Sequence, residues 1–333
     1  MKLDKKLYPW ADCLSDDDFI SDTPSYTGGE FLNLFEDRLF TGADKSVGAL
    51  RYYVYDPTKH GFPASGKYPV IFALHGAGGS LVGKTAVGWA GAETFASPEY
   101  QRRMGGAYIV CPLANEKADK QGAKRMCWTT PIADGGLCGY PQSIADALQP
   151  FMERRKFIVT LLGVNSVYTA SLLRLLSEAL ASFTSCGKVV LFGSSAGGYA
   201  AWRMLITAPE RFCAALLIGA AYLPSPDELE KVSAAGVKLL IYNGVHDELV
   251  DYSFFIEPIL PYLRKMPRVQ LLLPELLRNA DGGVASNIAG GVQMGQHCGN
   301  NIVSQDLMYL TGEPMADVCP RGVTGWIKDV CGE

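Results

Sequence analysis

The chain has 333 residues, of which 48% are hydrophobic and 19% are charged, and its formal net charge is −4 at pH 7. This composition excludes a largely disordered chain, and the weakly acidic balance gives no electrostatic basis for a nucleic-acid partner. A chain of this length can bury a sizeable core, so we expect a globular protein.

The first 45 residues are polar and irregular, and we predict that residues 1–45 form an extension to a domain spanning residues 46–333. No hydrophobic stretch follows the first lysines, so the chain does not begin with a signal peptide as written. No run approaches the roughly 18 apolar residues that a membrane span needs. We therefore expect a cytoplasmic protein with no membrane partner.

Nine cysteines are scattered along the chain, and no two have the spacing Cys-x-x-Cys. With only four histidines as further ligands, the spacing does not support a zinc site, and we expect neither a metal nor a cofactor. Free thiols in a reducing compartment are the default interpretation. Cys127 and Cys138 would be paired only if the protein were exported.

Beyond the extension, short hydrophobic runs of strand length alternate with segments of helical periodicity. The aromatic-rich residues 49–57 predict a first strand. The later runs are unbroken, which is typical of parallel strands covered on both faces. They occupy residues 68–74, 107–113, 188–193, 214–220, 237–243 and 268–274, and the clearest helical segments occupy residues 166–183 and 198–208. This alternation predicts an α/β fold with a mostly parallel, doubly wound sheet.

One long stretch, residues 114–156, interrupts the alternation with turn-forming residues. Long loops inside a compact domain are usually functional. We predict that this stretch is an inserted, cap-like segment beside the functional site.

The sequence FGSSAGGYAA, residues 192–201, contains the pattern Gly-x-Ser-x-Gly with Ser195 at its centre. A predicted strand precedes it and a predicted helix follows it, which is the setting of a nucleophilic serine. The residues flanking Ser195 are all Gly, Ser or Ala, as a tight turn requires. A small-residue turn of another α/β fold is the alternative, and the pattern alone does not decide between the two.

A serine hydroxyl needs a general base, and the four histidines allow this base to be chosen by elimination. Where a Gly-x-Ser-x-Gly turn carries the nucleophile, the chain order is Ser, then the acid, then His. His60 and His75 precede Ser195, and His246 lies where the acid loop is expected. The predicted base is therefore His297, in the sequence GGVQMGQHCGNN.

The acid is expected soon after the strand predicted at residues 237–243. Asp247 lies four residues past this strand, on an Asn-Gly turn. A buried carboxylate there would orient His297 and stabilise its imidazolium form. Glu248 and Asp251 are close alternatives that would otherwise lie at a solvated helix start, and the distance from the strand favours Asp247.

An oxyanion hole requires two backbone N–H groups aimed at the developing charge. Ala196, the residue after the predicted nucleophile, is expected to supply one. The glycine-rich sequence FALHGAGGS, residues 72–80, is expected to supply the other from Ala77, with Gly78 second. His75 in the same loop is expected to brace the loop rather than to take part in the chemistry.

These motifs make the chain resemble the α/β-hydrolase superfamily, in particular its feruloyl esterase, acetyl-xylan esterase, polyhydroxybutyrate depolymerase-like and predicted-peptidase branch. The resemblance covers roughly residues 49–310. It rests on the sequences YPVIFALHGAGGS, VVLFGSSAGGYAAWRMLITAPERFCAALLIGA, IYNGVHDELVD and GQHCGN. It implies a triad of Ser195, Asp247 and His297, and ester hydrolysis through an acyl-enzyme.

Three aromatic residues, Trp89, Trp128 and Tyr140, are candidates for lining a substrate pocket, with core packing or surface stacking as the alternative. The predicted substrate is a small-molecule or oligosaccharide ester, such as a hydroxycinnamoyl or acetyl ester of a sugar. The insertion and the loop at residues 275–296 are expected to restrict which acyl group reaches Ser195. A peptidase or an acyltransferase would use the same triad, and a non-catalytic binding protein could keep the scaffold, so these alternatives stay open.

Overall fold

A computed structural model describes residues 10–21, 29–115, 128, 167–279, 281–285, 288–289, 292–293, 296–297, 303, 306 and 319–332. Of the insertion predicted at residues 114–156, only Ala114, Asn115 and Trp128 are therefore described. The predicted pocket residue Tyr140 and the cysteines Cys127 and Cys138 lie outside the described residues.

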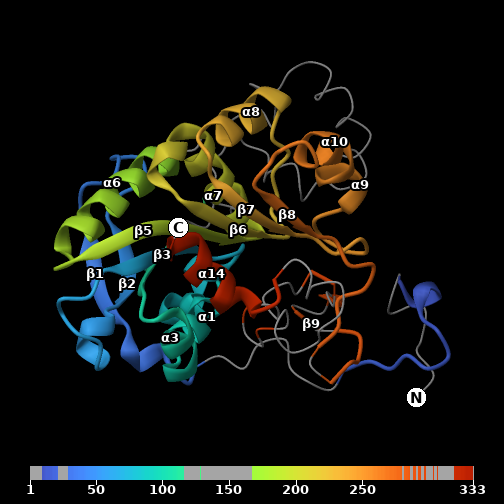
Figure 1. The fold of residues 1–333 in the computed structure, drawn as a ribbon, viewed down its shortest axis with the longest axis horizontal. Helices are drawn as coiled ribbons and strands as arrows, with labels where there is room; N and C mark the ends of the chain where they lie inside the picture. The colour runs from blue at the N-terminus through green and yellow to red at the C-terminus, as the bar shows by residue number, and fades with distance from the viewer. Residues whose placement is uncertain are drawn as a thin grey trace, which may run out of the picture.

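Eight strands form a single mixed sheet at the centre of the molecule, in the order β1-β2-β4-β3-β5-β6-β7-β8 (Figure 1). Only the β1–β2 and β2–β4 pairings are antiparallel, and all pairings from β4 to β8 are parallel. The strands are β1 (Glu36–Phe40), β2 (Leu50–Tyr55), β3 (Tyr68–Leu74), β4 (Tyr108–Pro112), β5 (Cys186–Ser194), β6 (Ala214–Ile218), β7 (Lys238–Tyr242) and β8 (Val269–Leu272). A separate short pair consists of β9 (Ile288–Ala289) and β10 (Val292–Gln293).

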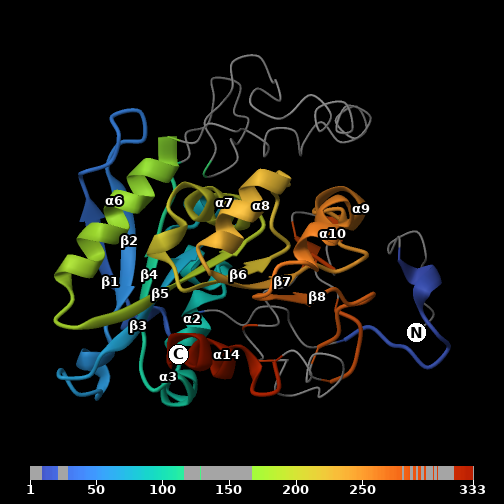
Figure 2. The same ribbon diagram turned by 45° about the horizontal axis from the view of Figure 1, so that its top comes forward.

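Helices cover both faces of this sheet (Figures 1 and 2). One face carries α6 (Val167–Ser182), α7 (Ala196–Thr207), α8 (Pro226–Ala234), α9 (Tyr252–Phe255) and α10 (Leu260–Leu263). The other face carries α1 (Ala86–Trp89), α2 (Ala92–Phe95), α3 (Pro98–Met104) and α14 (Gly322–Gly332). Short 3-10 turns lie at Ala11–Cys13, Leu32–Leu34, Pro57–His60, Gly79–Leu81, Gly83–Thr85, Pro209–Arg211 and Glu257–Ile259.

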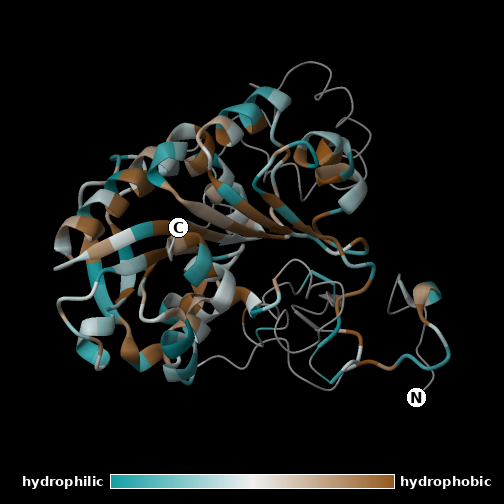
Figure 3. Cartoon of the chain, viewed as in Figure 1, coloured by the Kyte–Doolittle hydropathy of each residue, from teal (hydrophilic) through white to brown (hydrophobic). Residues whose placement is uncertain are grey.

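The two helical layers explain why the central strands are mostly hydrophobic (Figure 3). In β3, Val70, Phe72 and Leu74 belong to the core on the α6 and α7 face, whereas Ile71 and Ala73 belong to the core on the α3 and α14 face. Successive side chains of a strand point to opposite faces, so a strand covered twice needs hydrophobic residues at every position. The predicted α/β class with a mostly parallel, doubly wound sheet is confirmed.

The predicted runs coincide with strands β2 to β8, and the two clearest helical segments coincide with α6 and α7. The exception is β1, which lies within residues 1–45, the stretch that the sequence suggested was irregular. Its sequence EDRLF contains three charged residues, because β1 is an edge strand with partly exposed side chains. Charged side chains are usual on edge strands, where they discourage pairing with another chain.

The register of the parallel strands places their carboxyl ends at one edge of the sheet. Leu74 pairs with Gly193, Ser194 with Ile218, and Ile218 with Tyr242. In open α/β sheets, ligand-binding and active sites lie just beyond the carboxyl ends of the strands. The loops that follow β3, β5, β6 and β7 therefore start side by side.

Among the described residues, no helix combines the length and the apolar character needed to cross a membrane.

Candidate active site

Ser195 lies on a sharp turn between β5 and α7, at the carboxyl edge of the sheet. Its backbone adopts φ 56° and ψ −120°, a conformation that residues with a side chain rarely take. The turn is held on both sides: the Ser195 N–H donates to Ile218 O at 3.0 Å, and the Ser195 carbonyl accepts from Ala221 N–H at 3.1 Å. Such a strained residue, fixed by its surroundings, is typical of a functional site.

Two glycines of the Gly-x-Ser-x-Gly pattern are required by close backbone contacts. A Cβ added to Gly197 would lie 2.0 Å from the carbonyl oxygen of Leu74, and one added to Gly193 would lie 2.4 Å from the carbonyl oxygen of Gly197. No side chain fits at those distances. The pattern is therefore explained by packing of the turn against β3 and against the first turn of α7.

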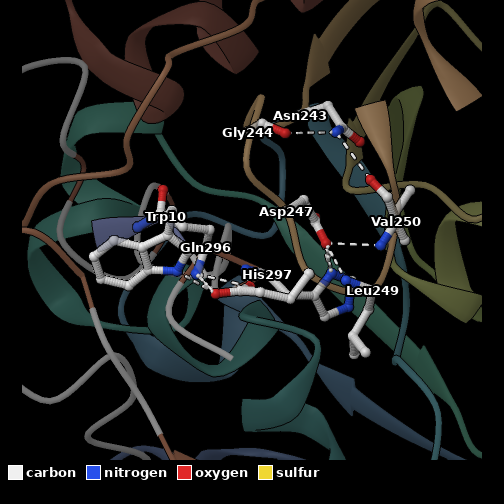
Figure 4. Close-up of polar contacts among 9 residues, drawn as sticks. Trp10, Asn243, Gly244, Asp247, Leu249, Val250, Gln296 and His297 are labelled. Atoms are coloured by element: carbon white, nitrogen blue, oxygen red, sulfur yellow. Dashed lines mark hydrogen bonds and ion pairs between the residues drawn. The ribbon is translucent and has the colours of Figure 1, made fainter. Parts of the chain in front are cut away.

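Asp247 and His297 form a hydrogen-bonded pair (Figure 4). The His297 Nδ1 atom lies 2.9 Å from each carboxylate oxygen of Asp247. Asp247 is held in turn by the N–H groups of Leu249 and Val250, at 2.9 Å and 2.7 Å from its Oδ1. With Nδ1 donating its proton to the carboxylate, the Nε2 atom of a neutral His297 is left to accept a proton.

The two alternative acids have other partners. The Glu248 carboxylate accepts hydrogen bonds from the backbone N–H groups of Gln296 and His297, and it holds the loop that carries the imidazole. Asp251 accepts from Ser253 N–H and caps α9. Of the three acidic residues, Asp247 is the one in contact with the His297 ring.

Gly219 links the acid–histidine pair to the serine. It follows Ile218, whose carbonyl oxygen accepts from Ser195. A Cβ added to Gly219 would lie 3.1 Å from Asp247 Oδ2 and 3.6 Å from His297 Nδ1. Among the described residues, no hydrogen bond joins Ser195 Oγ to His297 Nε2. Such contacts are often long without substrate and tighten on binding.

The surroundings of His297 change the pKa of its imidazole in opposite directions. Burial, the largest single influence, lowers the pKa, but the charge of Asp247, its hydrogen bond and the charge of Glu248 act together against it. The net result is a pKa above the ordinary value of 6.5. Because its cationic form is stabilised in this way, His297 is a stronger base than an ordinary imidazole when it accepts a proton during a reaction.

The glycine-rich loop after β3 is braced by His75, which is buried. His75 Nδ1 donates to Gly76 O at 2.8 Å, and Nε2 accepts from Ala114 N–H at 3.1 Å. Burial lowers the pKa of His75 to about 4, so this imidazole stays neutral and keeps both hydrogen bonds near pH 7. Trp128 Nε1 donates to the His75 carbonyl oxygen at 2.8 Å.

The two residues predicted to supply oxyanion donors belong to two segments that meet at the Ser195 turn. Ala196 is the first residue of α7, where backbone N–H groups lack partners within the helix. Ala77 is exposed in the loop after β3. Within the described part of the chain, neither N–H group donates to a backbone carbonyl. Gly76 brings the two segments together, since a Cβ added there would lie 3.5 Å from Ser195 Cβ.

The described aromatic candidates have different environments. Trp128 is fully buried, 4.7 Å from the His75 ring between ring centres, and packs edge-on against Tyr168. Trp89 is 39% exposed and lies against the glycine-rich loop after β3, because a Cβ added to Gly78 would be 3.6 Å from its ring. For both residues, substrate contact stays a prediction.

Sequence reasoning missed one residue that belongs to this network, Trp10. Its side chain is 2% exposed, and its Nε1 donates to Glu248 Oε1 at 2.7 Å (Figure 4). The Glu248 carboxylate therefore links Trp10 to the loop that carries His297. No periodic pattern surrounds Trp10 in the sequence, so only its residue type, a large aromatic in a polar segment, could have drawn attention to it.

Comparison with known proteins identifies the fold but not a closer relationship. No family model matches the chain, and no curated protein sequence matches it. Among solved structures, a thermostable esterase is 16% identical with a TM-score of 0.56, over 83% of this chain and 60% of the esterase. The chain thus spans about 60% of the length of that structure.

Two further solved structures align with TM-scores below 0.5. A ferulic acid esterase is 15% identical over 72% of this chain and 89% of its own, with a TM-score of 0.45. An IroE-like serine hydrolase from Shewanella oneidensis is 14% identical over 73% and 74%, with a TM-score of 0.41. The architecture and the likeness to the thermostable esterase define the class: this chain has an α/β-hydrolase fold.

Proposed function

We propose that this protein is a serine hydrolase that cleaves carboxylic esters through an acyl-enzyme. The observation that carries the proposal is the His297–Asp247 pair, hydrogen-bonded at 2.9 Å, on the same sheet edge as a strained Ser195. A nucleophile, an orienting acid and a base in this chain order are the components of a catalytic triad.

In the proposed acylation, Ser195 Oγ attacks the ester carbonyl carbon while His297 Nε2 takes the hydroxyl proton. The Ala77 and Ala196 N–H groups donate to the oxyanion of the tetrahedral intermediate. His297 then returns its proton to the leaving alcohol oxygen as the carbon–oxygen bond breaks. Asp247 fixes the ring and stabilises the imidazolium, and it stays ionised throughout.

In the proposed deacylation, a water molecule replaces the alcohol. His297 takes a proton from this water as its oxygen attacks the acyl carbon. The proton then passes to Ser195 Oγ, which leaves with the electrons of the acyl bond. The products are a carboxylic acid and the free enzyme, so the cycle needs no redox partner.

The proposed substrates are hydroxycinnamoyl or acetyl esters of a sugar, as the sequence resemblance implies. Trp89 supports an aromatic or sugar ring near the site, since it is partly exposed beside the glycine-rich loop after β3. Aromatic side chains with one exposed face commonly stack on such rings. A panel of acetyl, feruloyl and p-nitrophenyl esters, with matching amides and acceptor alcohols, separates an esterase from a peptidase or an acyltransferase.

The chain offers a matched control for the nucleophile, because two serines are adjacent. Ser195→Ala is expected to lower kcat for a p-nitrophenyl ester by at least about 10⁴-fold, since the attacking atom is lost. Ser194→Ala should retain activity, because Ser194 is the last residue of β5 and is buried. Circular dichroism checks that both variants fold. Near-normal turnover by Ser195→Ala, or equal losses in both variants, would contradict the proposal.

A further inference from the structure

A second cluster of reactive side chains lies outside the proposed active site. Cys13 comes from the amino-terminal segment, His246 from the loop after β7, and Glu275 from the loop after β8. The Cys13 Sγ atom is 3.2 Å from His246 Nε2, and Glu275 Oε1 is 4.0 Å from the same nitrogen. One ligand atom from each residue lies within 4.8 Å of the other two.

The arrangement is that of a chelate and not of a second catalytic triad. In a triad the acid and the nucleophile use opposite ring nitrogens of the histidine, as Asp247 does by taking Nδ1 of His297. Here the thiol and the carboxylate both face Nε2 of His246. Three ligand atoms within 4.8 Å of one another suit a shared cation.

The spacing and the ligand types favour zinc. Thiolate, imidazole and carboxylate bind zinc at about 2.0–2.3 Å, so neighbouring ligand atoms of a tetrahedral ion lie roughly 3.3–3.6 Å apart. The Cys13–His246 separation of 3.2 Å lies close to this range, and the His246–Glu275 separation of 4.0 Å exceeds it. The Glu275 side chain is 73% exposed and can rotate to shorten its distance without moving packed neighbours. A thiolate ligand disfavours Mg²⁺ and Ca²⁺, which prefer oxygen.

We propose that Cys13, His246 and Glu275 bind Zn²⁺, with water as the fourth ligand. Binding releases the Cys13 thiol proton to solvent, and the charges of thiolate and carboxylate balance that of the ion. No step of ester cleavage passes through this ion, so the inference is independent of the proposed function. The proposed site also revises the expectation that no metal binds, which was based on the spacing of cysteines and histidines. These ligands come from segments far apart in the chain, so their spacing in the sequence does not reveal the site.

The proposed ion would fasten the amino-terminal segment, residues 10–21, to the acid loop. At its far end this segment is already held, because Ser21 N–H donates to Val284 O at 2.9 Å and Asp18 pairs with Arg278 at 2.6 Å. At the near end, Cys13 N–H donates to the carbonyl oxygen of Trp10. Zinc would thus hold the turn that carries the Trp10 indole against Glu248.

Metal binding is tested directly with tag-free, reduced protein stripped by a chelator and titrated with Co²⁺ and then Zn²⁺. We expect one Co²⁺ per chain with thiolate-to-cobalt charge-transfer absorption, and displacement of Co²⁺ by Zn²⁺. Cys13→Ser should abolish this absorption and weaken Zn²⁺ binding by at least about 10- to 100-fold, the loss seen when even an outer partner of a ligand is removed. Glu275→Gln should weaken binding but keep the absorption.

Cys186→Ser is the matched control, because Cys186 is a free, half-buried thiol at the start of β5. It should bind both metals as the wild type does. Absence of the charge-transfer absorption in the wild type, or its persistence in Cys13→Ser, would overturn the metal site. Hydrogen exchange of residues 10–21 should slow on adding Zn²⁺ to the wild type. Unchanged exchange with bound Zn²⁺ would overturn the fastening role.

Discussion

The Asp247 carboxylate has two functions that a single substitution can separate. It accepts the His297 Nδ1 proton, and it accepts backbone N–H groups that shape its own loop. Asp247→Asn keeps an oxygen for the loop but removes the charge that orients and stabilises the imidazolium. We expect kcat to fall roughly 10³- to 10⁴-fold in ester hydrolysis assays with folding retained. Asp251→Asn is the control, and a similar loss there would argue against Asp247.

The raised pKa of His297 sets the expected pH dependence. The proposed base is the neutral imidazole, so kcat/KM should rise with pH and level off above a midpoint higher than 6.5. Asp247 and Glu248 are the charged groups that raise this pKa against the effect of burial. In Asp247→Asn the midpoint of the residual activity should therefore move to lower pH. A wild-type midpoint below 6.5, or one unmoved by this substitution, would contradict the assignment.

At the scale of elements, the amino-terminal segment reaches the site through Trp10. Trp10→Phe keeps the aromatic ring but removes the N–H group that donates to Glu248 at 2.7 Å. Because Glu248 holds the His297 backbone, we expect kcat to fall about 3- to 10-fold with KM unchanged, as a loss of positioning does. Steady-state kinetics on a soluble ester measures both constants.

Trp326→Phe is the control for this change. It also removes an indole hydrogen bond, to Gln270 between α14 and β8, but it leaves the Glu248 and His297 contacts in place. Its kcat should match that of the wild type. An effect of Trp10→Phe on KM alone, or no effect at all, would show that the segment does not position His297.

The sequence predicted the elements whose pattern has a single physical cause. Strands β3 to β7 lie between two helical layers, so their hydrophobic runs are nearly continuous and easily recognised. Strand β1 was not predicted, because an edge strand does not need a continuous run of hydrophobic residues. Its charged residues resemble those of a loop. The β9–β10 pair has two residues per strand, too few for any periodicity to appear.

At the scale of the whole molecule, sheet topology explains why the candidate site could be predicted. Ser195, the loop after β3 and the loop after β7 all follow carboxyl ends of parallel strands, which share one edge. Chain order and elimination among four histidines then pointed to His297, which the structure places 2.9 Å from Asp247. The contacts of Trp10 with Glu248 and of Cys13 with His246 depend on how the first residues cross the surface, which no local pattern encodes.

The central claim is that one serine of this chain is an activated nucleophile, and labelling with a fluorophosphonate tests it most directly. The probe forms a stable bond with a serine that has a base and an oxyanion hole beside it. Mass spectrometry of the digested protein should find one adduct per chain, on Ser195, and the adduct should be absent from Ser195→Ala and present in Ser194→Ala. An unlabelled wild-type protein, or an adduct on Ser194 or elsewhere, would contradict the proposed mechanism.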